Sequence, residues 1–334
     1  MNPQVEHRDH STRHLANEGQ PSGGTGTSSS TSGLPTTRPE PQALLTRVKS
    51  SVVVCVESMT GGSSTSQYAL GNTDAEHERL MRQAVCLAPL TERLLREAGI
   101  ASCRSVLDVG SGVGDVAMLA AGLVGPSGEV VGIERDSRSI ARARTRVAHA
   151  GLLNVNFMEC DVSQMQGGGT FDAAVGRFIL QFVPNPVAVL QSLSQVVRPG
   201  GVLVFQEVSY APLLALSAHL SLWSASVSLA RDTIKRLGAN PEMGVALHRN
   251  FQEAGLPPPT MRMEMLLGSA PEFTLWIYDL LCSLRPQIRA DHPSLEALGD
   301  FETLPARLQS EVALSRTVVP YVALVGAWSR KPAG

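Results

Sequence analysis

Short apolar runs alternate with longer, periodically apolar segments along residues 74–208. The longer segments repeat apolar residues every three or four positions, which is the spacing of a helix with one buried face. The short runs are bounded by polar residues and glycines, as is typical of buried strands. Helices are therefore predicted at 74–98, 115–124, 137–150 and 186–197, and strands at 105–109, 128–134, 155–160, 171–175 and 202–208.

This alternation of strands and helices indicates an α/β fold. Short connections between successive elements favour parallel strands joined by helical crossovers, so we expect a doubly wound, mostly parallel sheet. Asp74 and Gly99 are the expected caps of the first helix. In sheets of this kind, ligands bind beyond the carboxyl ends of the strands, where the strand order reverses. The loops that follow the predicted strands are therefore the place to look for a site.

The first 60 residues differ in composition from the rest of the chain. Residues 19–33 consist almost entirely of Gly, Ser and Thr, which bury too little apolar surface to offset the entropy lost on ordering. We therefore expect residues 1–60 to form a disordered tail. Acidic residues among its arginines argue against a transit peptide. The apolar stretch 51–56 is either an edge strand or part of an extension upstream of the true start.

Composition and charge argue against several classes of protein. The 28 Lys and Arg residues against 30 Asp and Glu give a net charge of −2, which does not suit binding to nucleic acid phosphates. No apolar run approaches the roughly 20 residues of a membrane span. The five cysteines are scattered without metal-binding spacing, which favours buried thiols over a disulfide framework. We expect a cytoplasmic protein with no metal site, no nucleic acid partner and no membrane span.

A glycine-rich turn follows the first strand of the alternating region. It reads Asp108-Val-Gly-Ser-Gly-Val-Gly-Asp115 and leads directly into a predicted helix. Glycines allow a ligand to approach the backbone closely, and the N–H groups at a helix start can hold an anionic group. A dinucleotide fingerprint would need a glycine where this chain has Asp115, whose carboxylate would repel a pyrophosphate. The turn favours a ligand with a small carboxylate and an amino group, from which Asp108 would accept a hydrogen bond. Glycine-rich turns after strands also occur simply to permit tight packing.

Polar residues also follow the next three predicted strands. Glu134 lies 20 residues beyond Gly114 and is placed to accept both hydroxyls of a ribose, although a lone acid at a strand end is often only solvated. Asp161 could accept from an exocyclic amine such as that of adenine, beside the N–H of Val162, or could simply cap the following turn. The backbone at Gly176 and Arg177, after the fourth strand, would line the remaining side of the pocket.

Taken in order, these motifs resemble those of class I S-adenosylmethionine-dependent methyltransferases. The chain is most similar to the branch with ubiquinone/menaquinone C-methyltransferases and many bacterial small-molecule methyltransferases. The resemblance is strong over residues 68–210 and includes 106–115, 171–178 and 198–201. It implies a Rossmann-like, doubly wound, mostly parallel seven-stranded sheet with a helical cap, in which 318–331 forms the antiparallel last strand.

The resemblance further implies that the cofactor is S-adenosyl-L-methionine. The glycine turn would hold the methionine end, the acid after the second strand the ribose, and the residues after the third strand the adenine. A tyrosine before the first helix would close over the cofactor. The expected cofactor-binding residues are Tyr68, Asp108, Gly110, Ser111, Gly112, Glu134, Asp161, Val162, Gly176 and Arg177.

The pattern changes beyond the core, which is expected at 68–210. Residues 211–300 are predicted to form a helical cap with an antiparallel strand insertion, and 301–334 a final helix and strand. No Lys or Arg occurs between Tyr210 and Ala230, so the cap suits an apolar acceptor better than a nucleic acid. The same apolar residues could also serve only to pack the cap onto the core.

No catalytic residue is evident. A general base is needed where the acceptor must lose a proton, and the candidates for it are Tyr210, His219 and His248. The candidates for acceptor contact are Tyr210, His219, Trp223 and His248, each of which could instead be packed in the interior or exposed. We expect methyl transfer to O, N or C of a fairly apolar small molecule. The alternatives are a methyltransferase that acts on a macromolecule, a non-catalytic cofactor-binding module and an NAD-dependent oxidoreductase.

Overall fold

The computed structural model describes residues 53–55, 73–103, 105–167 and 170–334. These residues belong to a unit that spans 49–334. The expected disordered tail lies outside the described residues apart from Val53–Cys55, and Tyr68 also lies outside them. Val53–Cys55 forms strand β1, which pairs antiparallel with β5 (Met165–Gly167), as the edge-strand interpretation of 51–56 predicts.

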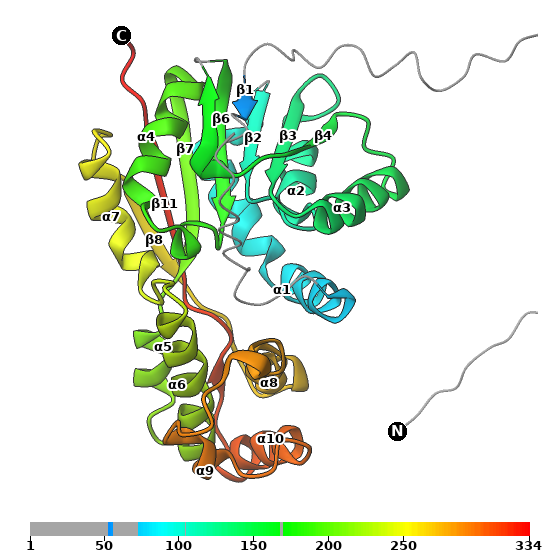
Figure 1. Ribbon diagram of the computed structural model, residues 1–334, viewed down its shortest axis with the longest axis vertical. Coiled ribbons are helices and arrows are strands. Elements are labelled where there is room, and N and C mark those ends of the chain that lie inside the picture. Colours follow the sequence, from blue (N-terminus) through cyan, green and yellow to red (C-terminus); the bar gives the residue numbers. More distant parts are fainter. Residues whose placement is uncertain (1–52, 56–72, 104, 168–169) are drawn as a thin grey trace, which may run out of the picture. The chain divides into compact units, whose positions relative to one another are not determined.

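Five neighbouring parallel strands form most of the sheet (Figure 1). Helices cover both faces of these strands, so the strands are almost continuously apolar rather than alternating between apolar and polar. Their side chains point alternately to the two faces and enter two separate hydrophobic clusters. In spatial order they are β4 (Val155–Glu159), β3 (Glu129–Glu134), β2 (Ser105–Val109), β6 (Phe171–Arg177) and β7 (Val197–Val208).

Two further strands complete a seven-stranded sheet next to β7. Strand β11 (Leu324–Arg330) pairs antiparallel with β7, and β8 (Thr260–Glu264) pairs antiparallel with β11. The expected last strand at 318–331 is interrupted, because Val319–Pro320 forms a separate strand, β10, with β9 (Leu267–Gly268). Pro320 has no N–H to donate to a continuous ladder. The predicted Rossmann-like sheet with an antiparallel last strand is confirmed.

Helices α1 (Asp74–Ala98), α2 (Asp115–Val124) and α3 (Ser137–His149) cover one face of the sheet, and α4 (Pro186–Val196) and α7 (Met243–Glu253) cover the other. The bounds of α1 and α2 match the predicted ones, and those of α3 and α4 differ by one residue. Thr73, not Asp74, caps α1, because its hydroxyl accepts from the Glu76 N–H at 3.2 Å. Gly99 ends α1 at φ 91°, as expected.

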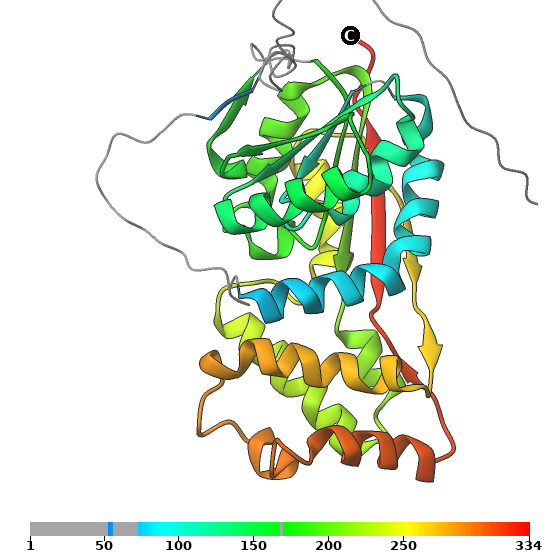
Figure 2. The same cartoon turned by 90° about the vertical axis from the view of Figure 1, so that its right-hand side faces the viewer.

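A group of helices beyond the carboxyl ends of the strands has its own hydrophobic core. Figure 2 shows α1 lying between the sheet and this group, which we call the cap helices. Trp223 and Trp276 pack edge to face in this core, with ring centroids 6.1 Å apart. The cap helices are α5 (Ala211–Leu216), α6 (Ser221–Arg236), α8 (Pro271–Leu284), α9 (Ser294–Leu298) and α10 (Leu304–Leu314).

The cap helices do not coincide with the segment 211–300 that the sequence assigns to a cap. Helix α7 lies within that segment but packs on the sheet, whereas α10 lies beyond it and packs on α6 and α8. The predicted division of the chain into core, cap and closing segment stays a prediction. Among the described helices, none is both long enough and apolar enough to cross a membrane.

Candidate functional site

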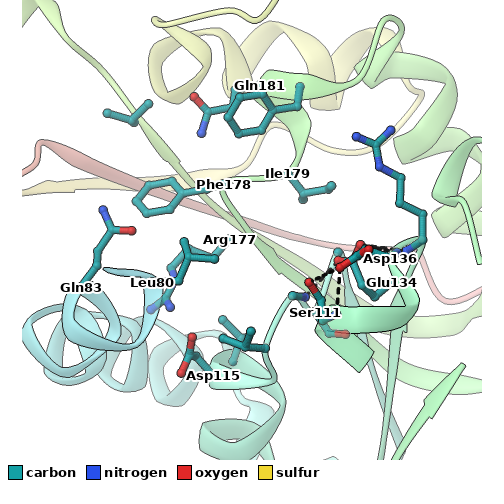
Figure 3. A pocket seen from close by; sticks show the side chains of 18 of the residues that line it. Leu80, Gln83, Ser111, Asp115, Glu134, Asp136, Arg177, Phe178, Ile179 and Gln181 are labelled. Carbon is teal, nitrogen blue, oxygen red and sulfur yellow. Dashed lines mark hydrogen bonds between the residues drawn. The ribbon is translucent and has the colours of Figure 1, made fainter. Parts of the chain in front are cut away.

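A cavity of about 570 Å³ opens at the carboxyl ends of the parallel strands (Figure 3). The strand order reverses between β2 and β6, which is where a doubly wound sheet binds its ligand. The cavity reaches from the loops after β3 and β4 to α1 and the cap helices. Of the predicted site residues, it brings together Gly110, Ser111, Gly112, Glu134, Asp161, Val162, Arg177 and Tyr210.

The glycine turn between β2 and α2 forms one wall of this cavity. Gly110 and Gly112 have φ values of 64° and 52°, in the left-handed region that favours glycine. A Cβ on Gly110 would lie 2.6 Å from the Ile179 side chain, whereas a Cβ on Gly112 would meet nothing within 4 Å. The backbone is therefore tightly packed on one side at Gly110 and open at Gly112.

Glu134 at the end of β3 is held by backbone donors. Its Oε2 accepts from the Gly112 N–H at 3.0 Å, and its Oε1 accepts from the N–H groups of Arg135 and Asp136 at 2.8 and 3.0 Å. These bonds join the glycine turn to the loop after β3 and fix the carboxylate at the cavity wall. Oε1 thus accepts two hydrogen bonds and Oε2 one, so one lone pair of Oε2 remains for a ligand hydroxyl.

Asp108 lies beneath the glycine turn rather than on the cavity wall. Its side chain is 1% exposed, and its Oδ2 has no partner among the described residues. Burial raises the pKa of Asp108 to about 7, with the charge of Arg177 and the Ala117 N–H acting against this rise. The neighbouring Ser111 hydroxyl is likewise buried without a described partner.

Asp115, the residue that distinguishes this turn from a dinucleotide fingerprint, lines the cavity at the start of α2. Its carboxylate forms a salt bridge with Arg146 of α3, with Oδ1 and Nη2 2.7 Å apart. Arg146 also donates to the Val113 carbonyl. A fixed carboxylate therefore stands where a pyrophosphate would need a glycine, which disfavours a dinucleotide.

Asp161 both caps a turn and lines the cavity. Its Oδ1 accepts from the Ser163 N–H at 2.8 Å and from the Ser163 hydroxyl at 2.6 Å, at the start of η3 (Val162–Gln164). The capping interpretation therefore holds without excluding contact with a ligand. The preceding Cys160 is in a disulfide, which corrects the expectation that the cysteines are all thiols.

Gly176 does not line the cavity, in contrast to the sequence-based expectation. A Cβ there would lie 2.7 Å from the ring of Phe205, so this glycine lets β6 pack closely against β7. Arg177 follows it and points into the cavity. Its Nη1 donates to the Thr91 hydroxyl at 3.0 Å, and that hydroxyl donates to Gln206 Oε1 at 2.7 Å.

The opposite end of the cavity is mainly apolar and is built from segments far apart in the chain. Amide groups and one phenol interrupt the apolar wall. Arg79 of α1 reaches this end, but it already forms a two-fold hydrogen bond with Glu76 at 2.8 and 2.6 Å. The wall consists of Arg79, Leu80, Gln83, Phe178, Gln181, Phe182, Tyr210, Ile234, Trp276, Leu280 and Val322.

The turn that contributes Phe178 to Phe182 is fixed by a buried acid. Phe178 has a φ of 57°, which is unusual for a residue other than glycine. Oε1 of Glu207, a fully buried residue of β7, accepts from the N–H groups of Ile179 and Leu180 at 3.0 and 2.8 Å. Burial raises the pKa of Glu207 to about 8. Glu207 thereby positions one wall of the cavity.

Residues 101–255 match the family described as "Methyltransferase domain". This segment is slightly less than half of the chain and contains the glycine turn, Glu134 and Asp161; we call it the methyltransferase domain. The chain is 32% identical over 139 residues to the ubiquinone/menaquinone biosynthesis C-methyltransferase UbiE of Coxiella burnetii, which covers 40% of this chain and 56% of that relative. It is 30% identical over 112 residues to the arsenite methyltransferase of Halobacterium salinarum, which covers 33% of this chain and 29% of that relative.

The chain thus spans little more than half the length of this UbiE relative. Among solved structures, the YcgJ protein of Bacillus subtilis is similar to it with a TM-score of 0.49 and 13% identity, over 73% of this chain and 98% of that chain.

The structure places some of the predicted acceptor residues at the cavity and others away from it. Tyr210 lines the cavity, and burial raises the pKa of its phenol. Trp223 is fully buried behind Trp276, which itself lines the cavity. His219 and His248 are exposed and do not line it, which corrects their assignment to the acceptor side; the His219 ring contacts the Thr317 hydroxyl at 3.3 Å.

Several lining residues outside the methyltransferase domain were missed in the sequence. His77, Leu80 and Gln83 lie three residues apart on α1 and face the cavity together. Their spacing marks one helix face, but nothing local says that this face meets the glycine turn. His77 Nε2 lies 3.1 Å from the Ser139 hydroxyl, which donates to Asp136 at 2.7 Å. In the described part of the chain, no group of three or more His, Cys, Asp or Glu residues could hold a metal ion.

Proposed function

We propose that the protein transfers the methyl group of S-adenosyl-L-methionine to a small, largely apolar acceptor. The observation that carries this proposal is a single cavity with two chemically different ends. One end is formed by the polar loops of the methyltransferase domain, and the other by apolar side chains of α1 and the cap helices. A volume of about 570 Å³ is in the range of small-molecule sites.

The residues at the polar end fit this cofactor. The carboxylate of Glu134 is fixed by three backbone N–H groups and keeps one lone pair, on Oε2, for a ribose hydroxyl. Asp161 and Val162 lie beyond it, where an adenine would extend. The open backbone at Gly112 leaves room for the methionine chain. These placements also argue against a dinucleotide, because Asp115 stands at the end of the glycine turn.

The protein's own part in the reaction is to orient the acceptor and exclude water. When bound, the cofactor supplies a methyl group already activated on a sulfonium. Phe178, Trp276 and Leu280 provide apolar contact for an acceptor, while Gln83 and Tyr210 provide hydrogen bonds that set its orientation. Placing two reactants in this way supplies several kcal/mol of the barrier reduction, up to about 7–11 kcal/mol in well-oriented cases.

The names of the relatives agree with a small-molecule acceptor. UbiE of Coxiella burnetii is named for ubiquinone and menaquinone biosynthesis, and the relative from Halobacterium salinarum is named for arsenite. We extend to this chain only the class of a small acceptor. The side chains of the acceptor end favour an apolar compound over an ion such as arsenite, because the cation Arg79 is already paired with Glu76.

The test is incubation of the full chain with radiolabelled S-adenosylmethionine and a cell extract separated by size. Label is expected in the small-molecule fraction, where mass spectrometry identifies the product. The Glu134→Ala variant is the control, because losing the ribose acceptor should weaken binding of S-adenosylhomocysteine about 10- to 100-fold. Label in the macromolecular fraction would overturn the proposed acceptor, and cofactor binding without transfer would overturn the proposed activity.

A further inference from the structure

Arg177 brings a partly buried positive charge to the cavity, and none of the described carboxylates forms an ion pair with it. Its one hydrogen bond among the described residues runs from Nη1 to the neutral Thr91 hydroxyl. No salt bridge to Arg177 occurs in the described ranges. Asp115, the largest Coulombic influence on its pKa, is already paired with Arg146. A partly buried guanidinium with one hydrogen bond to a neutral hydroxyl keeps further donors for a ligand.

The guanidinium is fixed from behind before any ligand arrives. Thr91 of α1 and Gln206 of β7 are both buried and form the chain Arg177–Thr91–Gln206 through bonds of 3.0 and 2.7 Å. Arg177 lines the cavity, so a ligand there can reach its remaining donors. A guanidinium fixed in this way is suited to bind a carboxylate through two parallel hydrogen bonds.

The position of Arg177 indicates which carboxylate it binds. In the parallel pairing of β2 and β6, Val109 lies opposite Gly176, so Arg177 and Gly110 leave the sheet side by side. Figure 3 shows Arg177 in the part of the cavity near Asp115 and Leu80, away from Glu134. This is the methionine end of the proposed cofactor site.

We propose that the Arg177 side chain binds the α-carboxylate of the cofactor's methionine moiety. This inference rests on the proposed function. The methionine moiety is a zwitterion, and the site offers charges of both signs, with Arg177 for the carboxylate and Asp115 near the ammonium. The other lining arginines suit this role less well, because Arg79 is paired with Glu76 and Arg135 is exposed at the opposite end.

The test is calorimetry with two ligands and needs no acceptor. One ligand is S-adenosylhomocysteine, and the other is its decarboxylated analogue, which lacks only the carboxylate. The wild-type protein should prefer S-adenosylhomocysteine about 10- to 100-fold, as expected for a charge-assisted pair. In Arg177→Met this preference should fall below about threefold, through weaker binding of S-adenosylhomocysteine alone. Arg135→Met is the matched control and should keep the wild-type preference.

Each other outcome overturns a different claim. Equal weakening of both ligands in Arg177→Met would show that Arg177 only maintains the shape of the site. Unchanged binding of both ligands would assign Arg177 to the acceptor instead. Arg177→Lys, which keeps the charge without the fork, should retain an intermediate preference and serves if Arg177→Met does not fold. Failure of the wild-type protein to bind either ligand would overturn the proposed function itself.

Discussion

The two ends of the cavity are built in different ways. The cofactor end consists of loops that follow consecutive strands, and its main contacts are backbone N–H groups and carboxylates such as Glu134. The acceptor end combines one face of α1, the turn after β6, Tyr210 beyond β7, two cap helices and a residue before β11, and these are spread from Arg79 to Val322. Its main contacts are apolar side chains. The first end is defined by the local course of the chain, and the second by tertiary packing.

This difference separates the energetics of the two ends. The loops of the cofactor end lie on the central sheet and its two hydrophobic clusters. Trp276 and Leu280 of the acceptor end belong instead to the core of the cap helices. We therefore expect changes in the cap core to alter stability and acceptor binding while leaving the intrinsic affinity for the cofactor unchanged.

The largest effect is expected for Trp276→Ala. Trp276 packs against Trp223 and Tyr321 with ring centroids 6.1 and 5.6 Å away, and its indole N–H donates to the Pro320 carbonyl at 3.1 Å. Its truncation leaves a void, so the free energy of unfolding should fall by about 3–5 kcal/mol in urea titrations.

In folded Trp276→Ala protein, the affinity for S-adenosylhomocysteine should stay within about twofold of wild type, because Trp276 packs in the core of the cap helices and not in the clusters beneath the cofactor-end loops. Trp276→Phe is the matched control and should lose less than half as much stability. A tenfold loss of cofactor affinity in Trp276→Ala would show that the two ends are coupled.

Much of the fold could be predicted, because local signals set the elements. The glycine turn from Gly110 ends β2, and Asn185 with Pro186 starts α4 at the predicted residue. The misses come from tertiary context. The Pro-Gly-Gly motif at 199–201 is typical of a turn, yet β7 starts at Val197, because Val197 pairs with Phe171 across an irregular register. The local sequence pattern does not indicate such a pairing between distant residues.

The candidate site follows the same division. Seven predicted cofactor residues line the cavity. They could be predicted because they directly follow strands, and the carboxyl ends of parallel strands meet at one edge of the sheet. Glu207 was missed although it is an acid inside an apolar strand, which is itself a signal of a buried polar role. Gln83 carries no such signal, because its position depends on how α1 docks against the glycine turn.

A smaller effect is expected for Glu207→Ala, which acts on the turn between the two ends. It removes the acceptor of the Ile179 and Leu180 N–H groups, and leaving buried donors unsatisfied should cost about 2–3 kcal/mol in the free energy of unfolding. Glu207→Gln retains an acceptor of the same size and should remain within about 1 kcal/mol of wild type. Equal losses in both variants would contradict the role as an acceptor for the turn.

The pH dependence of stability distinguishes the two buried acids. Burial raises the pKa of Asp108 from 3.8 to about 7 and that of Glu207 from 4.5 to about 8. Between these limits the folded state holds more protons than the unfolded state, so each acid makes the free energy of unfolding fall as pH rises, by about 1 kcal/mol per pH unit. Asp108→Asn should remove the contribution of Asp108 to this slope below pH 7. Glu207→Gln should remove the contribution of Glu207 up to pH 8.

Urea titrations from pH 5 to pH 8 measure these slopes. Saturating S-adenosylhomocysteine should reduce the contribution of Asp108 to the slope, because the ligand's ammonium favours the ionised form of this carboxyl. It should leave the contribution of Glu207 to the slope unchanged. Equal slopes in wild type and both variants would show that neither acid is protonated in the folded protein at neutral pH.

The smallest effects are expected for His219→Ala and His248→Ala, the two residues that sequence reasoning placed at the acceptor. Both side chains are exposed and outside the cavity, and the Thr317 contact of His219 is a long one at an exposed site. Each change should alter the free energy of unfolding by less than about 0.5 kcal/mol. In a transfer assay, KM for the acceptor and kcat should both stay within about twofold of wild type.

Tyr210→Phe is the matched comparison inside the cavity, because it removes one hydroxyl from the acceptor wall and should raise KM for the acceptor. A rise in KM for either histidine variant that equals the rise for Tyr210→Phe would mean that the acceptor extends over the outer surface of the protein, where these histidines lie.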